Sequence, residues 1–131
     1  MLKKLLPKEL WKTKICNQEY WCGYDVLNDY IIFSKKYLRD KEYKEDLKKD
    51  LEIYFNITLT QKEYFMVALL HELGHKYYKN KYNLNELRDI AFTKVLNRLQ
   101  YWDKPYEKEA MDFAKHFFKL YKEKQNEAQK I

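Results

Sequence analysis

Residues that break regular structure are scarce in this chain, which has two glycines and two prolines among 131 residues. Because these residues supply most tight turns and helix ends, their scarcity predicts long helices and few hairpins. A chain of this length accommodates one hydrophobic core, so we expect residues 1–131 to form a single domain. The apolar share of 46% is sufficient for such a core.

A small sheet is expected in the N-terminal part of the chain, at about residues 11–35. Asn28-Asp29 is a turn signal, and the segment Tyr30-Ile31-Ile32-Phe33 after it is aromatic and β-branched, as strands prefer. Tyr24–Leu27, before the turn, completes a hairpin. The more mixed stretch from Ile15 to Tyr24 is expected to form an irregular strand. We therefore predict a small antiparallel sheet or hairpin.

Four helices are predicted to follow this sheet, at about residues 37–54, 61–79, 85–101 and 104–124. The second has the clearest start, because Thr60 followed three residues later by Glu63 forms a capping box. Asp103 and Pro105 mark the start of the fourth helix. Residues after about 124 are expected to fray. The sequence thus predicts a mostly helical α+β fold.

The second predicted helix contains His71-Glu72-Leu73-Gly74-His75, an H-E-x-x-H pattern. Residues four apart lie one above the other on a helix, so the imidazoles of His71 and His75 can reach one metal ion. Glu72 is rotated from His71 by about a hundred degrees, beside the open side of the metal. There it can accept a proton from the metal-bound water that attacks a carbonyl. Gly74 is costly inside a helix, which predicts the close approach of another backbone or of the metal.

A catalytic zinc site needs a third protein ligand and one open position. The metzincin pattern would place Gly at 78 and His at 81, but the chain has Tyr78 and Lys81, which exclude that class. The third ligand must therefore come from elsewhere, with Glu86, Asp89, Glu107, Glu109, Asp112 and His116 as candidates. The phenol that would stabilise the oxyanion is also left open, among Tyr77, Tyr78, Tyr82 and Tyr101.

The segment Tyr106–Ala114 resembles the second signature of the ImmA/IrrE-like gluzincins, roughly E-x-E-A-[ND]-x-F-A on a later helix. The resemblance implies a zincin-like fold, zinc bound by His71, His75 and Glu107, and Glu72 as the base. Glu109 stays as an alternative ligand. The chain departs from the signature at Met111, where the family has Asn or Asp as a supporting polar residue.

Two further features of the chain resemble such peptidases. Gly23–Phe33 is similar to the small sheet before their active-site helix, which implies an edge strand that binds an extended substrate. Minimal-scaffold gluzincins of about this length share the same parts, and some are held latent by a C-terminal segment. The polar tail Lys122–Ile131 is a candidate for that role, although fraying is the simpler interpretation.

The expected function is that of a zinc endopeptidase with one Zn²⁺ ion and a protein or peptide substrate. By resemblance, the substrate is a transcriptional repressor in a phage or mobile-element setting. The alternative is a non-catalytic binding or regulatory protein on the same scaffold, which contacts a repressor or nucleic acid. Met111, the small size and the net charge of +6 motivate this alternative.

The charge pattern and the apolar runs of the chain indicate where in the cell the protein is expected. The basic residues are interleaved with acids along the chain, which is typical of solvated helix faces more than of a nucleic-acid patch. Met1–Leu6 is short, basic and stopped by Pro7, unlike a secretory signal. No apolar run is long enough to span a bilayer, so a membrane partner is not expected. We therefore expect a cytoplasmic protein in which Cys16 and Cys22 are reduced, partly buried fillers.

Overall fold

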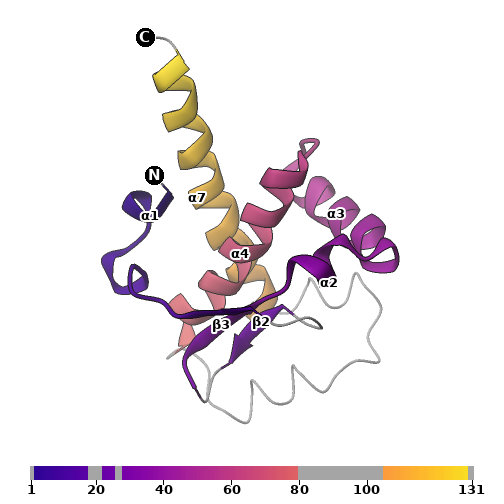
Figure 1. Ribbon diagram of the computed structural model, residues 1–131. Coiled ribbons are helices and arrows are strands. Elements are labelled where there is room, and N and C mark those ends of the chain that lie inside the picture. The colour runs from indigo at the N-terminus through magenta and orange to yellow at the C-terminus, as the bar shows by residue number, and fades with distance from the viewer. Residues whose placement is uncertain (1, 18–21, 26–27, 80–104, 130–131) are drawn as a thin grey trace.

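The computed structural model describes residues 2–17, 22–25, 28–79 and 105–129. Within these residues the fold is α+β: helices make up most of it, and one three-stranded sheet lies across them (Figure 1). The predicted helix at about 85–101 lies outside the described residues, as do Asp103 and the candidates Glu86, Asp89, Tyr82 and Tyr101.

The sheet consists of β1 (Ile15–Asn17), β2 (Gly23–Asp25) and β3 (Tyr30–Phe33), in the order β1-β3-β2. The predicted hairpin is confirmed, since β2 and β3 pair antiparallel with Gly23 opposite Ile32. The expectation of a purely antiparallel sheet is wrong, because β1 pairs parallel to β3 with Ile15 opposite Ile31. Apolar patterning indicates a strand but not its pairing partner, and β1 pairs with β3, not with β2, the next strand in sequence.

The turn between β2 and β3 falls at Asn28-Asp29, as predicted. The backbone N–H of Asn28 donates to Oδ1 of Asp25 at 3.1 Å, and the N–H of Asp29 donates to the Asp25 carbonyl at 2.9 Å. Asp29 has a φ of 55°, in the left-handed region that Asn and Asp tolerate better than most residues. These contacts fix the turn and, with it, the register of the hairpin.

The N-terminal part of the helical layer differs from the prediction. Two short segments, α1 (Leu2–Leu5) and the 3₁₀ helix η1 (Lys8–Leu10), precede the sheet. The predicted single helix at 37–54 is wrong: the chain forms α2 (Lys35–Arg39) and α3 (Lys41–Phe55), separated at Asp40. The hydroxyl of the buried Tyr64 donates to the Leu38 carbonyl at 3.1 Å, which gives this end of α2 a tertiary partner that no helical pattern reveals.

The two long helices are α4 (Gln61–Tyr77) and α7 (Pro105–Gln129). The capping box at the start of α4 is confirmed: Oγ1 of Thr60 accepts from the Glu63 N–H at 3.2 Å, and Oε1 of Glu63 accepts from the Thr60 N–H at 3.0 Å. The predicted end of the last helix at about Lys124 is wrong, because α7 continues to Gln129. Its last turns are rich in Glu, Lys, Gln and Ala, which are good helix formers.

Helices α4 and α7 pack antiparallel along most of α4, and this packing forms the centre of the fold (Figure 1). Near the start of α4, Oε2 of Glu63 forms an ion pair with Nζ of Lys122 in α7, at a distance of 2.8 Å. Near its end, Gly74 contacts Ala110 in the first turns of α7. The apolar side chains between the helices and the sheet form one core, which includes Ile31, Leu38, Leu51, Leu59, Tyr64, Val67, Leu70, Met111, Ala114 and Phe118.

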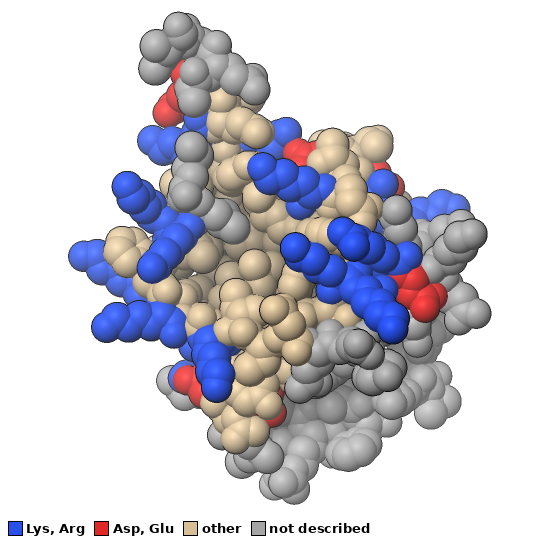
Figure 2. Space-filling view, in the orientation of Figure 1, with Lys and Arg blue, Asp and Glu red and all other residues tan. Residues whose placement is uncertain are grey.

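The surface carries its basic charge in more than one place. On the face drawn in Figure 2, Lys and Arg side chains lie on both flanks, with uncharged surface between them. The basic charge of this face is therefore divided between two flanks. None of the helices in the described part of the chain has the length and apolar character that crossing a membrane requires.

Candidate metal centre

His71 and His75 lie on the buried face of α4, with 6% and 5% of their surface exposed. Their Nε2 atoms are 3.1 Å apart, and their rings meet edge to face with centroids separated by 4.6 Å. The prediction that the two imidazoles share one helix face is therefore confirmed. The capping box at Thr60 and the uncharged run Phe65–Leu70 explain why this part of α4 is a stable, inward-facing helix.

Glu107 enters the same space from the first turn of α7 and is 3% exposed. Its Oε2 lies 2.9 Å from Nε2 of His71 and 3.3 Å from Nε2 of His75. Two ligand atoms bound to one tetrahedral zinc ion at ordinary bond lengths are separated by about 3.3 Å. The three atoms thus have nearly the mutual spacing of ligands around one ion, and the group could bind a metal ion.

The other candidate ligands in the described residues do not join this group. Glu109 is two residues further along α7 and only partly buried. Asp112 is exposed and accepts a hydrogen bond from the Tyr54 hydroxyl. His116 is also exposed, with its ring against Phe117. Of the alternatives left open by spacing alone, the structure brings Glu107 to the two histidines.

The electrostatics of the group favour a negative carboxylate on Glu107 and a positively charged imidazole on His71. Burial opposes a charge on Glu107, but the charges and hydrogen bonds of His75 and His71 outweigh it and hold the pKa of this carboxyl well below its usual value. Burial likewise opposes a charge on His71, but the hydrogen bond and charge of Glu107 prevail and raise the pKa of this imidazole. Two imidazoles and one carboxylate are also a donor set that suits zinc and several other divalent transition metals.

Glu72 follows His71 on α4 but stands apart from the three ligand atoms, with its side chain only partly covered. Burial raises its pKa, against the lowering effect of His71 and His75. Burial also raises the pKa of the Cys22 thiol to about 11, and the charge of Glu72 adds to this rise. Cys22 directly precedes β2, a strand that contacts α4. Cys22 and Cys16 are partly buried free thiols, as predicted.

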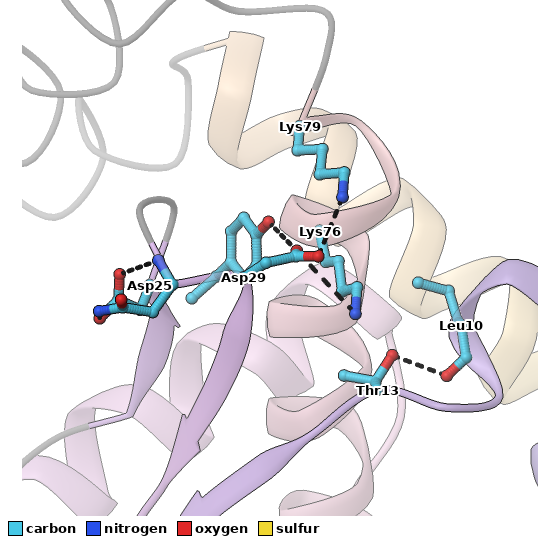
Figure 3. Close-up of polar contacts among 8 residues, drawn as sticks. Leu10, Thr13, Asp25, Asp29, Lys76 and Lys79 are labelled. Atoms are coloured by element: carbon cyan, nitrogen blue, oxygen red, sulfur yellow. Dashed lines mark hydrogen bonds and ion pairs between the residues drawn. The ribbon is translucent and has the colours of Figure 1, made fainter.

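A polar network joins the hairpin turn to the last turn of α4 (Figure 3). Oδ2 of Asp29 accepts a hydrogen bond from the Lys79 ammonium at 3.1 Å, and Oδ1 of Asp29 lies 3.9 Å from the Lys76 ammonium. The Tyr24 hydroxyl donates to Oδ1 of Asp29 at 2.5 Å. Lys76 comes directly after the H-E-x-x-H pattern, and its side chain is only 11% exposed. Asp29 is therefore the partner of the Lys76 charge. Because Tyr24 of β2 also bonds to Asp29, these contacts hold β2 beside α4.

Gly74 lies where α4 and α7 come closest. A Cβ at this position would be 2.9 Å from Cα and 3.0 Å from the carbonyl oxygen of Ala110, both of them backbone atoms. The predicted close approach of another backbone is therefore confirmed. Ala110 is one turn after Glu107, so the contact at Gly74 sets how far this carboxylate reaches toward α4.

Replacing Gly74 by alanine is expected to destabilise the protein and to weaken metal binding. The change gains about 1 kcal/mol of helix propensity. Overpacking against a backbone that cannot rotate away costs about 1–3 kcal/mol, which offsets or exceeds that gain. Chemical denaturation of the metal-free protein and a metal titration measure the two effects. Unchanged values for both would contradict the role assigned to this contact.

Sequence reasoning did not single out Tyr106, whose ring stacks on that of His75 with centroids 4.0 Å apart and planes inclined by 19°. Its only signal is its place immediately before Glu107. Met111, where the resemblance expects Asn or Asp, is buried one turn after Glu107. Tyr77 and Tyr78, two of the candidates for stabilising the oxyanion, both have their rings against Phe113.

No protein-family model, curated protein or solved structure matches this chain. The geometry of the buried His and Glu group therefore carries the functional argument.

Proposed function

We propose that this chain is a zinc-dependent endopeptidase in which His71, His75 and Glu107 hold the ion. The observation that carries the proposal is the convergence of these three buried side chains from two helices, one of which also carries Glu72. The zincin-like character of the fold and the relationship to ImmA/IrrE-like gluzincins belong to the same proposal. They rest on the motif residues and on the arrangement of α4 and α7.

The reaction is hydrolysis of a peptide bond by water. A bound zinc ion supplies a Lewis acid that polarises the substrate carbonyl and lowers the pKa of water. Glu72 accepts a proton from the attacking water as the oxygen bonds to the carbonyl carbon. The same carboxylic acid then protonates the departing amine when the C–N bond breaks. His71, His75 and Glu107 are ligands and take no part in proton transfer.

The substrate is proposed to be an extended stretch of protein. Strand β2 pairs only with β3 among the described strands, so its other edge can accept a peptide by strand addition. The network of Asp29 with Lys76 and Lys79 fixes this hairpin to the helix that carries Glu72. A peptide along β2 would therefore run beside the catalytic group. The resemblance suggests a transcriptional repressor as the substrate, in a cytoplasmic, phage or mobile-element setting.

The proposal predicts one zinc ion per chain, and this ion should stabilise the fold. A ligand present at a hundred times its dissociation constant adds about 2.7 kcal/mol to the free energy of unfolding. Metal analysis of the purified protein and thermal unfolding with and without a chelator measure both effects. A chain with no zinc, and with the same unfolding curve in chelator, would instead support the non-catalytic alternative. Steeply salt-dependent DNA binding would point in the same direction.

A further inference from the structure

Tyr106 and His75 form a stacked pair across the interface of α7 and α4. Their ring centroids are 4.0 Å apart and their planes are inclined by only 19°. Tyr106 is 9% exposed, so the pair is shielded from solvent. The neighbouring ring of His71 meets His75 at 81°, edge to face. Ring contacts thus confine His75 on a face and on an edge.

Within the described residues, the second ring nitrogen of His75 has none of the hydrogen bonds that usually support a ligating histidine. Metal-bound histidines almost always donate their other N–H to a carboxylate, a carbonyl or a water, which fixes the ring orientation. Nδ1 of His75 is buried and has no hydrogen-bond partner within the described parts of the chain. Among the described residues, the stacked ring of Tyr106 is placed to hold the plane of this imidazole instead.

We infer that Tyr106 is a positioning residue, whose ring holds His75 in the orientation that metal binding requires. This inference rests on the proposed zinc site. Tyr106 and Glu107 are consecutive in the first turn of α7, so one turn of helix supplies a ligand and supports another. The close contact of Gly74 with Ala110 sets the distance at which this turn meets α4. Stacking here takes the place of a hydrogen bond.

Replacing Tyr106 by phenylalanine and by leucine separates the ring from its hydroxyl. Zinc affinity is measured by competition with a chromophoric chelator, and ligand geometry by the visible spectrum of the Co²⁺ form. Tyr106→Leu is expected to weaken zinc binding by about tenfold or more, the loss typical of removing a group that supports a ligand. Tyr106→Phe keeps the ring and should bind like the original chain. Tyr121→Leu, on the same helix and partly buried, is the matched control.

A readout without metal tests the stack itself. In the metal-free protein, the ring current of Tyr106 should shift the His75 ring protons upfield in NMR spectra, in the wild type and in Tyr106→Phe but not in Tyr106→Leu. The inference is overturned if Tyr106→Leu binds zinc like wild type, or if Tyr106→Phe loses as much affinity as Tyr106→Leu. It is also overturned if the His75 ring protons of the wild type show no upfield shift. This test does not depend on whether Tyr106→Leu folds. A wild type that shows the shift but binds no zinc would overturn the proposed function alone.

Discussion

Replacing Glu72 by glutamine is expected to abolish peptide cleavage while zinc stays bound. The amide has the shape of the carboxylate, but it cannot accept the proton of the attacking water. A positioned general base contributes about 10²–10⁴-fold to such a reaction, and the rate should fall by this factor. Cleavage of an unfolded protein such as casein measures the rate, and metal analysis measures the zinc content of the same samples.

Glu63→Gln is the matched control for this experiment, since it makes the same change nine residues earlier on α4. Glu63 lies in the capping box and pairs with Lys122, far from the ligands. Glutamine can also serve at this position of a capping box, so activity should be retained. Undiminished cleavage by the Glu72→Gln variant would rule out Glu72 as the base.

Replacing Glu107 by glutamine is expected to remove zinc from the site. The change keeps the length of the side chain but removes the only negative charge among the three ligand atoms, 2.9 Å and 3.3 Å from the two imidazoles. Loss of a group that merely supports a ligand costs about 10–100-fold in metal affinity, so loss of a ligand should cost more than about 100-fold. Competition with a chelator of known affinity measures the difference.

Glu109→Gln tests the alternative that the motif leaves open, because Glu109 is the other acid of the E-x-E signature. It is not part of the buried group, so its replacement should leave zinc affinity unchanged. Denaturation of both metal-free variants checks that each is folded. If Glu109→Gln loses zinc and Glu107→Gln keeps it, the ligand assignment is wrong.

The parts of the fold that depend on neighbours in sequence were predictable. The side chains of Thr60 and Glu63 each accept a hydrogen bond from the other's backbone N–H, so four consecutive residues are enough to predict the start of α4. The turn at Asp29 is equally local. The break at Asp40 and the parallel pairing of β1 with β3 were not predictable from local patterns. Leu38, just before the break, accepts a hydrogen bond from Tyr64, and β1 pairs with a strand that is not its neighbour in sequence.

The same distinction holds at the site. His71 and His75 share a face because a helix repeats every 3.6 residues, and no other segment is needed for that conclusion. Glu107 came from a resemblance, since spacing alone left six acids and histidines as candidates. Tyr106 gave no signal, because a tyrosine in a chain with thirteen of them marks nothing until a partner lies against it.

Local sequence patterns were enough to predict a capped helix with two histidines and a glutamate at spacings that suit a metal site. They also indicated, through Gly74, that another backbone passes close to this helix. The packing of α4 against α7 was needed to show that Glu107 meets the histidines and that the ring of Tyr106 stacks on His75. The physical reason is that helical geometry is set by local hydrogen bonds, whereas the meeting of α4 and α7 depends on side-chain packing between segments far apart in the chain.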